Sequence, residues 1–406
     1  MKKGLIIAMF STLCLQQAAQ GQAIEALQKW ESSNSAKIEE LANQEFANKA
    51  LSSAEAAKAA AILEQKWLKN AQQNYTRALN DNVITHNNLT LKFVKRVLGE
   101  KPADGYSLYI SMHGGGSAPS RVNDQQWANQ IRLYTPAEGI YIAPRAPWDD
   151  WNMWFKPGLD ELFEKLIQCM VATMGVNPDK VYLLGYSAGG DGVWRMAPRM
   201  ADRWAAASMM AGHPGEASQV NLRNTPFMIW MGEKDSAYNR NKLAVHHGKI
   251  MDSLQMADKA GYIHETHIIE GKGHWMQRAD TLAIGWMAKH RRNPYPERVV
   301  WRQEEVTRRN FYWLGVPDNQ ECRHKMTVIA EYNGNKINIE QCDYQSLTLY
   351  INDQMMNLDK PITVYYKGKK IFKGKAERTM ATMSQTLATR GDLRYMFTAK
   401  LEIKLQ

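Results

Sequence analysis

No stretch of about 18 apolar residues, the length that spans a bilayer, occurs in this sequence of 406 residues. Internal repeats are also missing, and so is a repeat-built N-terminal propeller. Concentrated positive charge is absent as well. Lys and Arg exceed Asp and Glu by 51 to 41, but they are scattered, with only short clusters such as 289–292. Because a nucleic-acid-binding surface gathers its charge on one face, this argues against a nucleic-acid partner. Attraction to acidic polysaccharide surfaces is compatible with the net charge of +10.

Cysteine is scarce, with four residues in the whole chain. Cys14 lies in an apolar N-terminal run, and Cys169 falls in an apolar helical pattern that predicts a buried thiol. Cys322 and Cys342 are compatible with a disulfide in an oxidising compartment. The sequence leaves open whether they pair.

The N-terminus has the three regions of a secretory signal. Lys2 and Lys3 precede an apolar run at 5–15, and small residues follow at 18–23. The apolar run is too short for a stable membrane anchor. We therefore predict a signal peptide at 1–23 and a periplasmic or secreted mature protein without a membrane span.

Composition divides the remaining chain into three parts. Residues 24–85 are rich in Ala, Glu, Lys and Leu and contain no Pro or Gly, which predicts a helical segment with a break near 32–35. Residues 86–293 alternate strand and helix patterns, which predicts an α/β fold with a mostly parallel sheet and helices on both faces. Prolines at 294 and 296 mark a boundary, and residues 294–406 predict a small β-rich domain.

Hydrophobic periodicity places the individual elements. In the α/β part we expect strands at 89–98, 106–112, 139–143, 180–184, 205–210, 227–231 and 262–269. We expect helices there at 158–174, from about 188, at 241–260 and at 276–290. In the last part we expect strands at 327–331, 336–339, 347–351 and 362–366, hairpin turns at 333–334 and 367–368, and a helix at 379–388.

The strongest local signal is the sequence Gly-Tyr-Ser-Ala-Gly at 185–189. It follows an apolar strand and opens a helix, which is the setting in which G-x-S-x-G marks a nucleophile. The glycines on either side of Ser187 remove side chains that would clash in so sharp a turn. The alternative is a glycine-rich turn in which Ser187 only caps the helix.

A glycine loop with the sequence His-Gly-Gly-Gly at 113–116 follows the strand that ends at Met112. Backbone N–H groups in such a loop can approach a substrate oxygen closely. We predict an oxyanion hole formed by the N–H of Gly115 or Gly116 together with that of Ala188. A merely flexible loop is the alternative.

Two loops after later strands supply the remaining polar groups. Asp235, with Glu233 as the alternate, follows strand 227–231, and His274 lies on a glycine-framed loop after strand 262–269. The chain order Ser, Asp, His is the triad order of the α/β-hydrolase architecture. In such a triad His274 takes the proton of Ser187, and Asp235 orients the imidazole. This chemistry requires no metal and no cofactor.

On these motifs, residues 90–290 resemble the α/β-hydrolase superfamily. They are most similar to secreted bacterial esterases related to polyhydroxybutyrate depolymerases, feruloyl esterases and dienelactone hydrolases. The resemblance implies hydrolysis of a carboxylic ester, with Ser187, Asp235 and His274 in the matching positions. The helical segment and the β-rich part depart from the compact single-domain pattern, so the resemblance does not define a substrate.

Four tryptophans are candidates for substrate contact. Trp148, Trp151 and Trp154 follow strand 139–143, and Trp275 adjoins His274. Aromatic faces at that edge of the sheet can stack on a sugar or a phenolic acyl group. Local packing of the loop is the alternative.

Three functions fit these observations. The leading hypothesis is a secreted carboxylesterase that acts on an acylated polysaccharide, a small molecule or another exported ester. A serine peptidase of the prolyl-oligopeptidase type shares the triad order, but this chain lacks the propeller. The third is a binding or scaffold protein with a degenerate hydrolase domain. The oligomeric state is not readable from the sequence.

Overall fold

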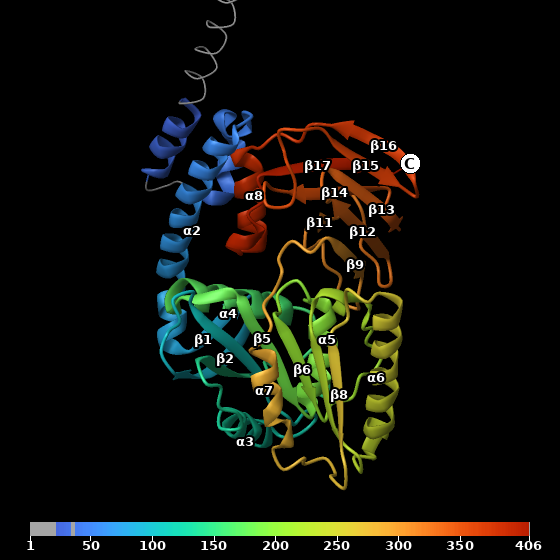
Figure 1. Ribbon diagram of the computed structural model, residues 1–406. Helices are drawn as coiled ribbons and strands as arrows, with labels where there is room; N and C mark the ends of the chain where they lie inside the picture. Colours follow the sequence, from blue (N-terminus) through green and yellow to red (C-terminus); the bar gives the residue numbers. More distant parts are fainter. Residues whose placement is uncertain (1–21, 34–36, 406) are drawn as a thin grey trace, which may run out of the picture.

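The computed structural model describes residues 22–33 and 37–405. The predicted signal peptide, apart from its last two residues, and Cys14 lie outside the described residues. Figure 1 shows an α/β body and a β-rich body stacked on each other, with the long helix α2 running along the side of both. No helix in the described ranges combines the length and the apolar character needed to cross a bilayer.

The α/β body is built on an eight-stranded sheet with the order β1-β2-β4-β3-β5-β6-β7-β8. Strand β2 pairs antiparallel with β1 and β4, and the other pairs are parallel. The strands are β1 (Val83–His86), β2 (Leu89–Leu98), β3 (Tyr106–Met112), β4 (Gly139–Arg145), β5 (Val176–Tyr186), β6 (Ala206–Met210), β7 (Phe227–Gly232) and β8 (His264–Ile269). The mostly parallel sheet with helices on both faces confirms the predicted fold class.

Alternate residues of the central strands bury two different faces. In β3, Leu108 and Ile110 pack into the larger core, whereas Tyr109 packs into the smaller, tyrosine-rich core on the other face. The larger core includes residues of α4, α5 and α6, and the smaller one includes residues of α7. The helices of this body are α3 (Ser120–Gln130), α4 (Leu159–Met174), α5 (Ala188–Arg199), α6 (Arg240–Ala257) and α7 (Leu282–Met287).

The helix predicted at 276–290 is shorter in the structure. Gln277 and Arg278 have φ angles of 53° and 67°, in the left-handed region, so an α-helix cannot run through them. A 3₁₀ turn, η5 (Ala279–Thr281), follows them and leads into α7. Helix α3, by contrast, has no counterpart among the predicted elements.

The N-terminal segment is helical at 22–31 and in α2 (Ser53–Asp81), which begins with a capping box between Ser52 and Glu55. Between them the prediction of helix is wrong, because the chain forms two 3₁₀ turns, η1 (Ile38–Asn43) and η2 (Glu45–Asn48). The Asn48 side chain donates to the carbonyl oxygens of Ala42 and Gln44, and such bonds compete with α-helical ones.

The β-rich body contains two sheets, with the orders β10-β11-β14-β17 and β16-β15-β13-β12-β9. Its strands are β9 (Arg298–Arg302), β10 (Asn310–Phe311), β11 (Leu314–Gly315), β12 (Thr327–Asn333), β13 (Lys336–Cys342), β14 (Ser346–Ile351), β15 (Ile362–Tyr366), β16 (Lys369–Gly374) and β17 (Ala399–Lys404). Helix α8 (Met380–Arg390) packs against the N-terminal turns, and η6 (Leu393–Tyr395) follows it. Both predicted hairpins are present, with turns at 334–335, one residue later than predicted, and at 367–368. Cys322 and Cys342 are free thiols and do not form a disulfide.

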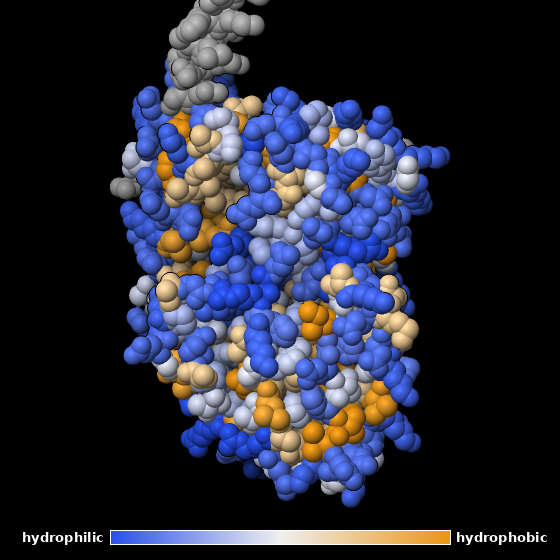
Figure 2. All heavy atoms as spheres, in the orientation of Figure 1, coloured by the Kyte–Doolittle hydropathy of each residue, from blue (hydrophilic) through white to orange (hydrophobic). Residues whose placement is uncertain are grey.

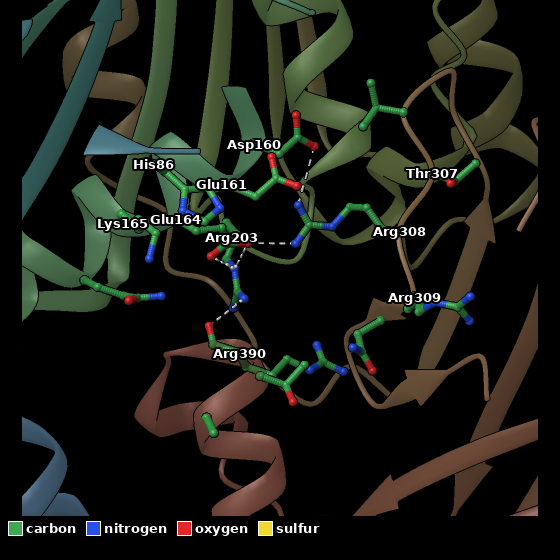
Figure 3. A pocket seen from close by; sticks show the side chains of 15 residues that line it. His86, Asp160, Glu161, Glu164, Lys165, Arg203, Thr307, Arg308, Arg309 and Arg390 are labelled. Carbon is green, nitrogen blue, oxygen red and sulfur yellow. Dashed lines mark hydrogen bonds and ion pairs between the residues drawn. The ribbon is translucent and has the colours of Figure 1, made fainter. Parts of the chain in front are cut away.

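Buried ion pairs join the two bodies around a cavity of about 370 Å³ (Figure 3). Arg203 of the α/β body binds Glu164 at 2.7 Å and Asp392 of the β-rich body at 3.2 Å. Arg308 reaches back from the β-rich body to Glu164, also at 2.7 Å. Arg292 bonds Asp392 at 2.7 Å. Each charge has a partner from another part of the fold, which fixes the two bodies relative to each other.

Candidate active site

Ser187 lies in the sharp turn between β5 and α5. Its backbone has φ 57° and ψ −120°, a conformation that L-residues rarely adopt. A Cβ on Gly189 would lie 2.1 Å from the carbonyl oxygen of Met112, and one on Gly185 would lie 2.3 Å from that of Gly189. Only glycine fits at these two positions, so the motif allows the strained turn that exposes the Ser187 hydroxyl.

The structure brings Ser187, His274 and Asp235 together in one chain of hydrogen bonds. The Nε2 atom of His274 lies 2.8 Å from the Oγ atom of Ser187, and its Nδ1 atom lies 2.7 Å from Oδ2 of Asp235. Asp235 is buried, whereas the His274 side chain is 43% exposed. A buried carboxylate behind a half-exposed imidazole is the geometry in which the carboxylate orients the ring and stabilises its charged form.

Glu233, the alternate acid, does not contact His274. Its carboxylate accepts a hydrogen bond from the N–H of Gly271 at 2.8 Å. Gly232 also packs closely on the same loop, because a Cβ there would lie 2.1 Å from the carbonyl oxygen of Gly273. Glu233 therefore fixes the loop that carries His274, while Asp235 contacts the ring.

Tyr186 is a positioning residue that the sequence analysis did not identify. Its hydroxyl donates to the carbonyl oxygen of His274 at 2.6 Å and accepts from the N–H of Met276 at 3.1 Å. Burial raises the pKa of Tyr186 well above its ordinary value, so the hydroxyl stays neutral. The residue before Ser187 thus holds the backbone of His274. Its place inside the G-x-S-x-G motif was the only signal in the sequence.

The glycine loop lies beside Ser187, because a Cβ on Gly114 would be 3.2 Å from that of Ser187. The N–H of Gly116 donates to Oδ1 of Asn123 at 3.0 Å, and Nδ2 of Asn123 donates back to the Gly116 carbonyl at 3.0 Å. Because its N–H is occupied, Gly116 does not serve the oxyanion hole as the sequence analysis expected. Gly115 and Ala188 remain the candidate donors, and Asn123 on α3 holds the loop.

His113 supports the same loop from inside the protein. Its Nδ1–H donates to the carbonyl oxygen of Gly114 at 2.6 Å, and its Nε2 accepts from the N–H of Ala146 at 3.2 Å. Burial lowers its pKa to about 4, so the ring is neutral at physiological pH. Both ring nitrogens of His113 therefore form hydrogen bonds to the backbone, and His113 has a structural role.

The four tryptophans separate into two groups. Trp151 and Trp275 are 64% and 51% exposed and line hollows beside Ser187. Trp154 is buried and donates from Nε1 to the carbonyl oxygen of His113 at 2.8 Å, so its predicted substrate contact is wrong. Trp148 packs against the larger core, with the Lys156 ammonium group over its ring, and lines neither hollow. Sequence spacing could not separate the inward from the outward rings.

Ser187 lies between two hollows of similar size. The first, about 540 Å³, is called here the arginine hollow, and its lining includes Arg195, Arg240, Asp191, His213, Trp151 and Tyr238. The second, about 530 Å³, is called the tryptophan hollow, and its lining includes Trp275, His274, Tyr186, Leu133, Gln126 and Gln130. His274 borders only the second hollow, which makes the two sides of the nucleophile chemically unequal.

Asp191 and His213 form part of the wall of the arginine hollow. Oδ1 of Asp191 accepts a hydrogen bond from the N–H of His213 at 2.6 Å. Burial raises the pKa of Asp191 to about 6, and the pKa of His213 is lowered by its burial and by nearby Arg240 and Arg195. Within residues 22–33 and 37–405, no three His, Cys, Asp or Glu side chains are grouped to hold a metal ion.

The carboxyl edge of the sheet lies at the end of the α/β body farthest from the β-rich body, where the loop from β8 leads to α7 (Figure 1). Apolar surface gathers at this end in the view of Figure 2. The exposed hydrophobic residues Trp275 and Leu282 belong to the segment after β8. The half-exposed side chain of His274 therefore lies at the end of the α/β body away from the β-rich body.

No protein-family model and no curated protein matches this chain. Among solved structures, a thermostable esterase is similar over 52% of this chain and 62% of its own length, with 17% identity and a TM-score of 0.40. The feruloyl esterase module from Clostridium thermocellum is similar over 51% and 86%, with 14% identity and a TM-score of 0.35. Esterase 2 from Thermogutta terrifontis is similar over 51% and 90%, with 18% identity and a TM-score of 0.33. The strand order described above and the strand–turn–helix at Ser187 give this chain the fold of the α/β-hydrolases.

Proposed function

We propose that this protein is an exported serine hydrolase that cleaves carboxylic esters through an acyl-enzyme. The observation that carries the proposal is the chain of two short hydrogen bonds from Ser187 through His274 to Asp235. The strained backbone of Ser187 supports it, because strain of this kind collects at functional sites. Export rests on the signal pattern at the N-terminus.

In the proposed first step, Nε2 of His274 takes the proton of the Ser187 hydroxyl while Oγ attacks the ester carbonyl carbon. The carbonyl oxygen becomes an oxyanion, which the N–H groups of Gly115 and Ala188 can stabilise. The protonated His274 then gives its proton to the departing alkoxide. Water, deprotonated by the same ring, releases the acid and restores the Ser187 hydroxyl.

This mechanism assigns the two hollows different parts of the ester. The leaving alcohol must lie beside Nε2 of His274, because that atom protonates it. His274 and Trp275 border the tryptophan hollow, so the alcohol occupies that side. The acyl chain then extends from Ser187 into the arginine hollow, which His274 does not border.

The test is covalent labelling with a fluorophosphonate probe together with hydrolysis of 4-nitrophenyl acetate. We expect Ser187→Ala to abolish labelling and to lower kcat about 10⁴-fold or more, because the triad acts as a unit. Ser253→Ala is the matched control, since Ser253 is an exposed residue on α6. Labelling of Ser187 with cleavage of a prolyl anilide instead of the ester would indicate a peptidase. No labelling at all would indicate a non-catalytic protein and would refute the proposal.

A further inference from the structure

The two hollows beside Ser187 differ in charge. The arginine hollow is lined by two guanidinium groups, from Arg195 and Arg240, together with one acid, Asp191. Among the described residues, the lining of the tryptophan hollow includes no Lys, Arg, Asp or Glu, and His274 is its only basic side chain. The pocket that the proposed mechanism gives to the acyl chain is therefore the one with fixed positive charge.

The partners of these arginines leave their charge available to a ligand. The Arg240 side chain is 13% exposed, its closest carboxylate oxygen is Oδ1 of Asp235 at 3.8 Å, and its buried Nε has no hydrogen-bond partner among the described residues. The Arg195 guanidinium lies over the Phe155 ring and 3.6 Å from Glu305. Arg292, at the interface between the two bodies, differs from these arginines because it is bonded to the carboxylates of Asp392 and Asp179 at 2.7 and 2.8 Å.

Asp191, the acid that lines the arginine hollow, offsets the charge of Arg195 and Arg240 only in part. Asp191 is already bonded to the N–H of His213. Because burial raises its pKa to about 6, a fraction of Asp191 is protonated near neutral pH. Two guanidinium groups, which stay charged at every physiological pH, therefore line the hollow beside one carboxylate, and their other neighbours, Glu305 and Asp235, lie 3.6 and 3.8 Å away.

We infer, on the basis of the proposed function, that the arginine hollow binds an acyl chain whose far end carries a second carboxylate. The preferred substrates are then monoesters of short dicarboxylic acids. A guanidinium group binds a carboxylate through charge-assisted hydrogen bonds, and the nearest carboxylates of Arg195 and Arg240, at 3.6 and 3.8 Å, lie beyond hydrogen-bond distance. The hollow of about 540 Å³ has room for such a chain beside Ser187.

The experiment compares two substrates of the same size that differ only in charge. These are monoethyl glutarate and the ethyl ester of glutaramic acid, in which an amide replaces the free carboxylate. Ethanol release is measured with the full mature chain. We expect kcat/KM to be about 10- to 100-fold higher for the anionic ester, the range that one or two charge-assisted hydrogen bonds supply. Added NaCl should lower this preference, since salt screens the attraction.

Variants then assign the preference to the arginines. Arg195→Gln should lower the ratio about tenfold or more by slowing the anionic ester alone, and Arg195→Lys, which keeps the charge, should retain part of it. Arg240→Gln should lower the ratio too, and it should also slow both esters because Arg240 lies near Asp235. Arg77→Gln on α2 is the control, because it removes the same charge from a side chain that is 93% exposed.

The outcomes separate this inference from the function on which it rests. Hydrolysis of both esters with equal kcat/KM, or a preference that Arg195→Gln leaves unchanged, would refute the inference and leave the esterase intact. Failure of Ser187 to react with the fluorophosphonate probe would remove both. A preference for the amide would show that Asp191 dominates the hollow and would also overturn the inference.

Discussion

Buried charge is arranged differently in two regions of the molecule, at the junction between the bodies and at the carboxyl edge of the large sheet. At the junction, Arg203 and Arg292 each bind two carboxylates at 2.7 to 3.2 Å. At the edge, Arg240 has one carboxylate at 3.8 Å and an unused N–H. Fully paired charge fixes the position of two surfaces, whereas charge with spare hydrogen-bonding capacity can respond to a ligand or to a proton.

The largest effect on stability is expected from breaking the junction. Asp392→Ala would leave Arg203 and Arg292 without a shared carboxylate, and a buried pair broken on one side costs about 3 to 5 kcal/mol of unfolding free energy. Denaturant unfolding measures this loss, and the kcat of the surviving folded protein should be unchanged. Asp318→Ala is the control, because its carboxylate is 99% exposed and its surface pair with Arg309 contributes about 1 kcal/mol or less. A loss that small for Asp392→Ala would mean that the junction does not depend on paired charge.

A smaller effect on stability, which depends on pH, is expected from Asp191 at the carboxyl edge of the large sheet. Burial raises the pKa of Asp191 from 3.8 to about 6. Between about pH 4 and pH 6 the folded protein therefore holds a proton that the unfolded chain has released. Its contribution to stability is present below that window and is lost as pH rises through it, by about 3 kcal/mol. Asp191→Asn should make this slope less steep by that amount, which unfolding measured from pH 4 to 7 would detect, while buried Glu304, whose pKa is raised to about 7, keeps its own share. Asp318→Asn should leave the slope as it is, and an unchanged slope in Asp191→Asn would contradict the assignment to Asp191.

The smallest effect concerns the support of the glycine loop. Trp154→Phe removes the hydrogen bond from Nε1 to the His113 carbonyl, which should lower the unfolding free energy by about 1 kcal/mol. Because His113 precedes the loop that carries Gly115, kcat should fall severalfold as well. Trp151→Phe is the matched control, since that ring is 64% exposed, and it should leave stability unchanged. Equal effects of the two variants would contradict the separation of inward and outward tryptophans.

The sequence predicted the central strands well because both of their faces are buried. The apolar run at 106–112 coincides with β3 in full, and the polar residues directly after such runs meet at one edge of the sheet. This is why Ser187, Asp235 and His274 could be chosen from sequence alone. Helix α3 escaped prediction, because its sequence is mainly polar and has no marked apolar stripe. Asn123, which holds the glycine loop, was missed along with it.

Other features depend on packing that no local pattern records. The spacing of Trp151 and Trp154 is the same whether the rings face solvent or the core. The 3₁₀ turns at 38–48 have a composition suited to helix, but they pack as short turns against α8. The unpaired Nε of Arg240 and the hydrogen bond of the Gly116 N–H depend on how distant parts of the chain pack. The sequence therefore could not predict them.

Helix α2 has a consequence for how the two bodies can be studied apart. Near its start, Ala56, Ala59 and Leu63 pack with Met380 and Leu387 of the β-rich body, and further along Tyr75 donates to Gln168 of α4 at 2.8 Å. Helix α2 thus packs against the β-rich body near its start and contacts the α/β body further along. A chain shortened to end at residue 293 would leave the apolar residues in the first half of α2 exposed to water. The β-rich body therefore covers the apolar residues near the start of α2. Removing that body would expose them to solvent and favour aggregation.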